Sequence, residues 1–472
     1  MEKTMLTYAL KENDQPFYQQ VYSAIKKDIL AGRLTAHTKL PSKRAFAKHL
    51  GLSTITIENA YDQLIAEGYL YTQARKGYFV AKLQNLGRYQ SLAKPSPIRL
   101  QMKEEPDLTF DFSSSQLDSK HFPFSIMAKM MRQSMTDHKE ELLERSPSAG
   151  ILKLRQAIAD HLASFRGMQV DPQQIVIGAG TEYLYGILVQ LLGPDKIYCI
   201  ENPGYKKLKQ IYEAHRVTCQ LAAIDQEGVK VSDLRQVAAD IAHINPTHHF
   251  PTGISMPINR RYELLAWVNE EAGRYIIEDD YDSEFRFTGK PLPSLQSIDA
   301  SEKVIYLNTF SKSLTSTIRI SYMVLPLPLA KQYHDDLAFY SCTVSCFEQY
   351  WLANFISQGY FEKHINRMRL YYGRKRSQVM DSIHKQLQGQ AYRIIENQSG
   401  LHFLLEVETP LSDQAVKQAL LDQGIGIHSV SDYDMSIASP DSHCFLIQYA
   451  SFDIPRFKEA LNTFKNIVFP KQ

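Results

Sequence analysis

The chain has 472 residues, of which 44% are hydrophobic and 22% charged, with 22 Gly and 21 Pro. This length allows roughly two to four domains, and the composition excludes a disordered, collagen-like or low-complexity chain. The longest apolar stretch, residues 183–192, is about half the length of a bilayer span, and the first 30 residues do not resemble a signal peptide. We therefore expect a cytoplasmic globular protein with no membrane segment.

The cysteines are five in number and contain no CxxC pair. An odd count without paired spacing argues against a disulfide framework and against a zinc site. We expect free thiols and no metal at Cys199, Cys219, Cys342, Cys346 and Cys444.

The net charge of +2 is unevenly distributed along the chain. Residues 1–82 carry twelve Lys and Arg against seven Asp and Glu, whereas the remainder carries 41 against 44. A small basic module thus precedes a large, slightly acidic body, which makes a polyanionic partner for the N-terminal module worth testing.

Three short helices and a hairpin are predicted in residues 1–82. Apolar residues recur every four positions from Phe17 to Ile29, and Ser42 and Ser53 are N-cap candidates for two further helices that end at Gly51 and Gly68. Residues 69–72 and 78–81 are β-rich and are joined by a basic tip. This order of elements describes a winged helix-turn-helix, in which the third helix enters the DNA major groove.

Residues 40–80, LPSKRAFAKHLGLSTITIENAYDQLIAEGYLYTQARKGYFV, resemble the GntR-type winged helix. The resemblance implies a double-stranded DNA operator as partner and DNA contacts from Lys43, Arg44, Ser53, Thr54 and Thr56, with Arg75 and Lys76 on the wing. Many relatives have Arg where Thr54 stands, so a strong guanidinium contact to guanine is missing. A winged helix used only for protein contacts is the alternative.

Residues 83–107 form the predicted linker. They show no helical or strand period and include Pro95, Pro97 and Pro106, which favours a semi-extended segment. A loop packed on the body is the alternative.

From residue 108 onward, apolar β-rich runs alternate with helical stretches. The runs are residues 175–177, 198–200, 241–244, 275–278, 304–307 and 320–325. Because each run is apolar enough to be covered on both faces, we expect an α/β fold with a mostly parallel central sheet, whose ligands bind beyond the carboxyl ends of the strands. The body is assigned to residues 108–472, with a smaller C-terminal subdomain at about 366–472.

Reactive side chains follow several of these strands. Gly178-Ala179-Gly180-Thr181 opens a helix, whose free N–H groups can bind an anion. Asp279 and Tyr281 lie at the end of a strand, and their side chains point to the same side of it. Ser311-Lys312 is followed by Arg319. Taken singly, these features also fit a glycine turn, a solvated acidic turn and a surface lysine. Together they are what pyridoxal 5′-phosphate (PLP) requires.

Residues 112–467 resemble fold type I aminotransferases, and the whole chain resembles the MocR/GabR family of regulators, which join such a domain to a GntR-type head. The segments IVIGAGTEYLY, ENPGYKKL, HHFPTGISMP, YIIEDDYDSEF and NTFSKSLTSTIRISYMVLP carry this resemblance. It implies that Lys312 forms the Schiff base with PLP, that Asp279 pairs with the ring nitrogen, and that Tyr281 bonds the phenolic oxygen. It also implies a ring-stacking Tyr205 and a phosphate site made by Gly180, Thr181, Ser311 and Arg319.

The chain departs from the aminotransferase pattern at two positions. Phe250 stands where an Asn usually bonds the phenolic oxygen, and Ser451 stands where an Arg usually binds the substrate carboxylate. Lys206 or Lys207 is a candidate substitute cation, and a misalignment of the strand before Ser451 is the alternative.

The resemblance implies a homodimeric, PLP-dependent transcriptional regulator that senses a small molecule, either an amine or amino acid or PLP itself. The rival hypothesis is a PLP-dependent aminotransferase with an accessory DNA-binding domain. The winged helix and both departures favour the regulator.

Overall fold

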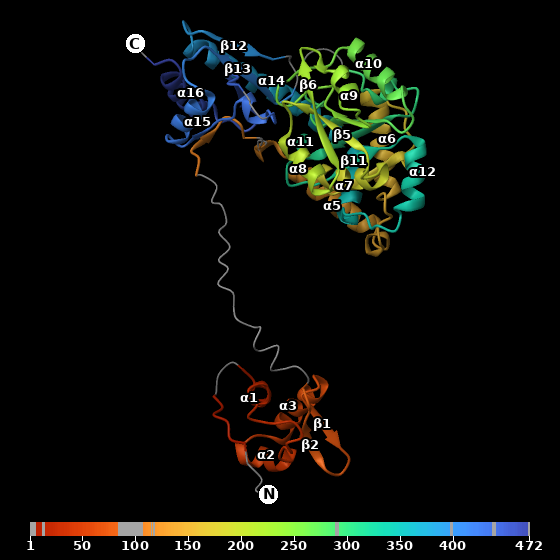
Figure 1. Ribbon diagram of the computed structural model, residues 1–472, viewed down its shortest axis with the longest axis vertical. Helices are drawn as coiled ribbons and strands as arrows, with labels where there is room; N and C mark the ends of the chain where they lie inside the picture. The colour runs from red at the N-terminus through yellow and green to blue at the C-terminus, as the bar shows by residue number, and fades with distance from the viewer. Residues whose placement is uncertain are drawn as a thin grey trace. The chain divides into compact units, whose positions relative to one another are not determined.

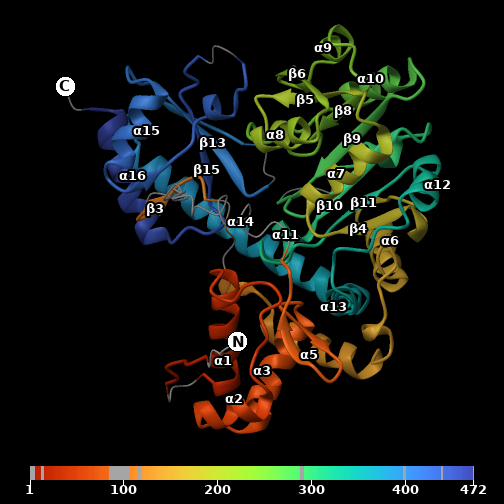
Figure 2. The ribbon, with the colours of Figure 1, turned by 60° about the horizontal axis from the view of Figure 1, so that its bottom comes forward.

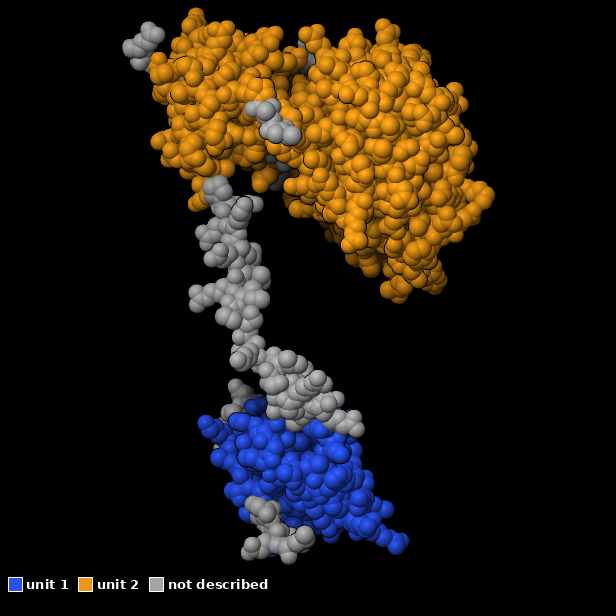
Figure 3. All heavy atoms as spheres, in the orientation of Figure 1, with its two compact units in different colours: residues 1–104 blue, residues 105–472 orange. Residues whose placement is uncertain are grey.

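The computed structural model describes residues 6–11, 15–83, 107–114, 116, 119–287, 292–396, 400–436 and 440–470. The chain divides into two compact units, residues 1–104 and 105–472, which Figure 3 colours separately. The predicted linker falls almost entirely outside the described residues, because residues 84–106 are not among them. No helix in the described ranges is long and apolar enough to cross a membrane.

The N-terminal unit is a winged helix-turn-helix (Figure 1). It contains α1 (Phe17–Leu30), α2 (Lys43–Leu50), α3 (Thr54–Ala66), β1 (Leu70–Gln73) and β2 (Gly77–Val80), and the two strands pair antiparallel. Ser42 and Ser53 cap α2 and α3 by accepting hydrogen bonds from the backbone N–H groups of Ala45 and Thr56. The apolar faces of the three helices meet in one core that includes Val21, Ile25, Phe46, Ile57 and Tyr61.

An eight-stranded sheet organises the second unit, in the order β4-β11-β10-β9-β8-β5-β6-β7. Its strands are β4 (Ile175–Gly178), β5 (Ile197–Asn202), β6 (Thr218–Asp225), β7 (Gly228–Val229), β8 (Ile241–Ile244), β9 (Tyr275–Asp280), β10 (Val304–Thr309) and β11 (Ser321–Val324). The strands from β10 to β6 are parallel, whereas β11 runs antiparallel to both β10 and β4, and β7 runs antiparallel to β6. The predicted mostly parallel sheet is confirmed.

Both faces of this sheet are buried. On one face α7 (Thr181–Leu192), α8 (Lys206–Ala214) and α12 (Leu327–Asp336) pack on strand residues such as Val176 and Ile305. On the other face α5 (Phe124–Asp137), α6 (Leu152–Arg166) and α13 (Cys346–Ser357) pack on Ile175 and Ile177, while α9 (Val231–Gln236) and α10 (Ile258–Asn269) pack on Ile276. Neighbouring residues of one strand thus face opposite helix layers, which explains the continuous apolar runs.

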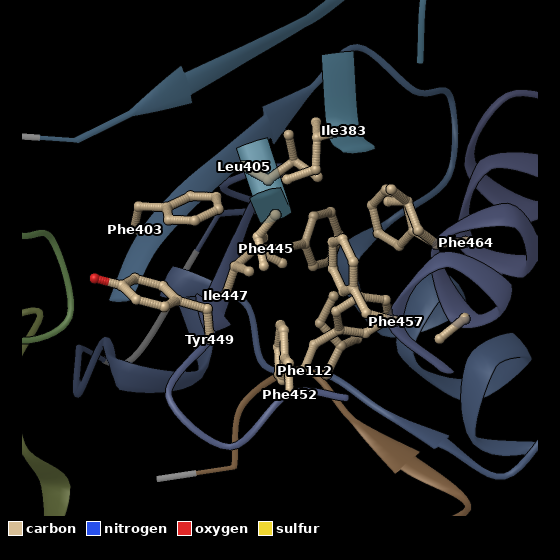
Figure 4. Packing of buried hydrophobic residues seen from close by; sticks show 14 of the residues in the cluster. Phe112, Ile383, Phe403, Leu405, Phe445, Ile447, Tyr449, Phe452, Phe457 and Phe464 are labelled. Carbon is tan, nitrogen blue, oxygen red and sulfur yellow. The ribbon is translucent and has the colours of Figure 1, made fainter. Parts of the chain in front are cut away.

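A second, smaller core belongs to the C-terminal part of the body. It contains the three-stranded sheet β12 (Tyr392–Ile395), β13 (His402–Val407) and β15 (Cys444–Gln448), the helices α14 (Tyr360–Gln386), α15 (Asp413–Leu421) and α16 (Ile454–Val468), and the pair β3 (Phe110–Asp111) and β14 (Ile425–Gly426). Phe112 packs here among Phe452, Phe457 and Phe464 (Figure 4). The start of the body therefore contributes to the core of its C-terminal part.

The long helix α14 links the two cores of the body, as Figure 2 shows. Phe361 and Ile365 near its start belong to the core on the large sheet, whereas Val379 and Ile383 near its end belong to the smaller core. Five 3-10 turns lie among the described elements: Ser119–His121, Glu141–Leu143, Pro172–Gln174, Gln296–Ile298 and Val430–Tyr433.

Candidate cofactor site and DNA-binding head

The site residues lie where the strands of the large sheet end. Strand register pairs Leu307 of β10 with Asp279 of β9, and Ser321 of β11 with both Thr309 and Gly178. The glycine turn after β4 and the short helix α11 (Phe310–Ser313) after β10 are thus joined through β11. The sheet brings together segments that are about 130 residues apart in the chain.

The predicted phosphate site is assembled around Gly180, the N-cap of α7. Gly180 has a φ of 95°, and a Cβ placed on it would lie 2.6 Å from Nη2 of Arg319. The Ser311 hydroxyl donates to Ile318 O at 2.9 Å, which ties α11 to the residue preceding Arg319. Thr181 is the first residue of α7. The N-terminus of a helix and a guanidinium therefore face the same place, as a phosphate requires.

Glu182 is an acidic neighbour of this place. Its Oε1 lies 3.7 Å from Nη2 of Arg319 and 2.5 Å from Nζ of Lys207. Arg319 retains 52% of its side-chain exposure. Lys207 is one of the predicted substitute cations for effector binding. Its ammonium is thus already paired with Glu182, beside the predicted phosphate site.

Asp279 has two unlike carboxylate oxygens. Oδ2 accepts a hydrogen bond from the Tyr185 hydroxyl at 2.6 Å and lies 3.5 Å from Nε2 of His243. Oδ1 is buried and has no hydrogen-bond partner among the described residues. His243 is held by the Tyr212 hydroxyl, 2.7 Å from its Nδ1. A buried carboxylate oxygen left unpaired is costly, so this atom is suited to a protonated ring nitrogen.

Lys312 lies on α11, and burial lowers the pKa of its amine, while the charge of Asp282 acts in the opposite direction. A lysine with a lowered pKa is more often neutral, which is the form that reacts with an aldehyde. Tyr281 is buried as well, and burial raises its pKa well above the usual value. Its hydroxyl lies 3.4 Å from Nδ1 of His248.

A buried group that the sequence did not indicate is formed by His248, Asp282 and His402, whose side-chain N and O atoms lie within 4.8 Å of one another. Nδ1 of His248 is 2.9 Å from Oδ2 of Asp282, and Nε2 of His402 donates to Pro251 O at 3.1 Å. Burial, and to a smaller extent the neighbouring His248 ring, lowers the pKa of His402 well below its usual value. The pair His248-His249 shows no periodic pattern, and only the acidic run at the end of β9 pointed to this region.

Tyr205 and Phe250 belong to an aromatic group. Tyr205 precedes α8, is 45% exposed, and lies edge-on to Phe250 with ring centroids 6.4 Å apart. Phe250 also contacts the rings of Tyr433 at 4.9 Å and His402 at 5.5 Å. Phe250 is thus a packing residue that offers no side-chain hydrogen bond, as the sequence predicts for this position. Asn245, which the sequence did not single out, donates from Nδ2 to Asp279 O at 2.7 Å.

Ser451 lies in the turn after β15, next to Ala450, whose carbonyl oxygen accepts a hydrogen bond from Lys375 at 2.8 Å. The replacement of a carboxylate-binding Arg by Ser451 stays a prediction. Lys375 is a buried cation near this position that the sequence did not indicate.

In the head, the side chains predicted to contact DNA differ in their solvent exposure and in whether they already have partners. Nζ of Lys43 lies 2.6 Å from Oε1 of Glu58 and 3.7 Å from Oδ1 of Asp62. The Lys43 ammonium is therefore already paired with two carboxylates of α3. The hydroxyls of Ser53 and Thr56 lie 2.8 Å apart and bond each other. The predicted contacts whose side chains are exposed to solvent are Arg44, Ser53, Thr54, Arg75 and Lys76.

The fold and these sites define a class of protein in which a winged-helix DNA-binding head precedes an aminotransferase-like body. Residues 17–80 match the family described as "Bacterial regulatory proteins, gntR family", and residues 109–464 match "Aminotransferase class I and II". The chain belongs to the MocR/GabR-type family of HTH transcriptional regulators, in which these two parts are joined.

Curated relatives resemble nearly the whole chain. An uncharacterized HTH-type transcriptional regulator of Bacillus subtilis, YdeL, is 40% identical over 418 residues, covering 89% of this chain and 90% of the relative. The probable rhizopine catabolism regulatory protein MocR of Rhizobium meliloti is 29% identical, covering 97% and 94%. The pyridoxine biosynthesis transcriptional regulator PdxR of Corynebacterium glutamicum is 29% identical, covering 88% of each.

Solved aminotransferases share the fold of the body. Kynurenine aminotransferase of Pyrococcus horikoshii, solved in complex with PMP, superposes with a TM-score of 0.67 at 20% identity, covering 82% of this chain and 94% of that chain. LysN of Thermus thermophilus, complexed with a phosphopyridoxyl-leucine compound, gives a TM-score of 0.64 at 20% identity, covering 76% and 92%. The protein is therefore an HTH-type transcriptional regulator with an aminotransferase-like domain.

Proposed function

We propose that this regulator binds PLP in the body and uses it to sense a small molecule. The observation that carries the proposal is Oδ1 of Asp279, which is buried without a partner among the described residues and lies on the strand next to the one that leads to Lys312. The residues present fit the cofactor, since they supply an amine with a lowered pKa, a carboxylate for the ring nitrogen and a cationic side chain for the phosphate.

The proposed roles of the side chains are those that the resemblance implies, and the structure adds Tyr185. Lys312 supplies the amine, Asp279 accepts from the ring nitrogen, and Tyr185 orients the Asp279 carboxylate by donating to Oδ2. Gly180, Thr181, Ser311 and Arg319 would hold the phosphate, Tyr205 would stack on the ring, and Tyr281 would bond the phenolic oxygen. PLP, when bound, supplies an aldehyde that condenses reversibly with primary amines.

The proposed effector is a primary amine or amino acid, or PLP itself. The aromatic group around Phe250 and the uncharged Ser451 offer less to a carboxylate than an Arg would, which supports sensing of PLP alone. The relative PdxR is named for the regulation of pyridoxine biosynthesis, which supports the same choice for this chain.

Absorbance spectroscopy tests the cofactor proposal. Purified protein with added PLP should show a visible imine band, and Lys312→Ala should lose it, whereas Lys331→Ala, which changes an exposed lysine on α12, should keep it. An unchanged band in Lys312→Ala would contradict the assignment. Formation of a keto acid from an added amino acid would instead favour the aminotransferase hypothesis.

The proposed assembly is a homodimer formed through the body, which presents two heads to two half-sites of one operator. Closed two-fold symmetry is the commonest arrangement of oligomers, and a two-fold dimer carries two DNA-binding heads. Sedimentation should give a dimer at micromolar concentration, and a monomer would contradict the proposal.

A further inference from the structure

An exposed isoleucine lies on the recognition helix of the head. Among the described residues of the head, the large apolar side chains that are exposed are Phe17, at 37%, and Ile55, at 68%. Ile55 is the second residue of α3, and Ile57, two positions later, is fully buried. Two residues are about 200° apart around a helix, so Ile55 points away from the core that holds Ile57.

The residues around Ile55 show what this end of the helix presents. Asn59, one turn further along the same face, is exposed, and so is Thr54. The hydroxyls of Ser53 and Thr56 bond each other, and Ser53 also accepts from Thr56 N at 3.1 Å. The first turn therefore presents one large apolar side chain together with the polar Thr54 and Asn59.

Further along α3, this face carries acidic side chains, which pair with a lysine of the head. Glu58 and Asp62 are both near the Lys43 ammonium. Their negative charge is unfavourable beside DNA phosphates, so the first turn of α3 is the part best suited to approach a duplex.

We infer that Ile55 is a specificity-determining residue that contacts the C5-methyl group of a thymine in the major groove. The inference rests on DNA binding by the head and goes beyond it by naming the base group that is recognised. Residues near the start of a recognition helix contact base edges, and the thymine methyl is the apolar group that the major groove offers. Contact with this methyl removes both apolar groups from water.

Uracil substitution tests the inference without changing the protein. Duplexes bound by the full-length protein are selected from a random-sequence pool, and each thymine of the selected site is replaced singly by deoxyuridine, which removes only the methyl group. One thymine in each half-site should weaken binding about fourfold when its methyl is removed, the value expected for one buried methyl group. Equal affinity for every substituted duplex would overturn the inference, whereas a pool that yields no bound duplex would overturn DNA binding by the head itself.

Variants of the protein test the same contact from the other side. Ile55→Ser should bind the thymine duplex about as weakly as wild type binds the uracil duplex and should no longer distinguish the two, whereas Ile55→Val should retain the distinction. Ile258→Ala is the matched control, because Ile258 is also an exposed isoleucine in the first turn of a helix. If Ile55→Ser keeps the full preference for thymine, or if Ile55 is instead covered by a partner protein and the preference is absent, the inference fails. Should Ile55→Ser not fold, the uracil scan decides alone.

Discussion

The two carboxylate oxygens of Asp279 differ in their hydrogen bonds within the proposed cofactor site. One carboxylate oxygen is fixed by Tyr185, and the other is buried without a partner among the described residues. The Tyr185 hydroxyl donates to this carboxylate at 2.6 Å, and in the proposed site Asp279 would pair with the ring nitrogen of PLP. In the proposed site, Tyr185 would be a positioning residue that acts through Asp279.

Tyr185→Phe should weaken PLP binding by roughly ten- to a hundredfold, because a hydrogen bond to a charged group contributes roughly 1.5 to 3 kcal/mol. The absorbance of the protein during titration with PLP measures this affinity. Tyr262→Phe on α10 is the control, since its ring is 57% exposed and outside the site. Equal PLP affinity in Tyr185→Phe and wild type would show that the hydroxyl does not support the carboxylate.

Residues that follow strands in a linear pattern could be predicted from the sequence, whereas partners supplied by distant segments could not. Asp279 and Lys312 could be selected because each lies at or shortly after the end of a predicted strand, and Arg319 because it follows Lys312 by seven residues. Tyr185 lies inside an apolar helix, and His402 begins a strand of the smaller sheet. Their roles depend on tertiary packing, which local patterns do not encode.

At the scale of elements, β5 carries a buried acid with a defined pH dependence. Burial raises the pKa of Glu201 from 4.5 to about 8, and its Oε1 has no partner among the described residues. Because the folded pKa lies above the unfolded value, the stability that Glu201 contributes is present at low pH and is lost as the pH rises through about 8.

Glu201→Gln should therefore make the unfolding temperature fall less steeply between pH 4.5 and about 8 than it does in wild type. Some dependence should remain, since burial also raises the pKa of Glu284 to about 8. Thermal unfolding followed by circular dichroism at several pH values measures it, with the exposed Glu227→Gln as control. A Glu201→Gln profile parallel to wild type would refute a protonated Glu201.

The wing between β1 and β2 carries Arg75 and Lys76 at an exposed turn. If each neutralises one phosphate, replacing both by Ala should reduce the slope of log affinity against log salt by about two. Filter binding at several salt concentrations measures the slope. Lys43→Ala is an informative comparison, because its ion pairs with Glu58 and Asp62 predict a smaller change. An unchanged slope in the wing variant would exclude phosphate contacts by the wing.

For the whole molecule, the order of elements was predictable and the detailed arrangement was not. Apolar runs such as residues 304–307 located β10 within two residues, because strands buried on both faces are continuous in sequence. The pairing of β11 antiparallel between β4 and β10, and the joining of β3 near residue 110 with β14 near residue 425, depend on contacts far apart in the chain.

In the proposed function, PLP bound in the body changes how the head binds DNA. Two sites of one protein are coupled when a ligand at one changes affinity at the other, and the coupling must be reciprocal. The most direct measurement is the operator affinity and footprint of the full-length protein with and without PLP, and with the amine effector added. We predict that PLP changes the affinity or the footprint in wild type and that Lys312→Ala loses this response while it still binds DNA. Identical affinity and footprint with and without PLP and amine would contradict coupling between the body and the head.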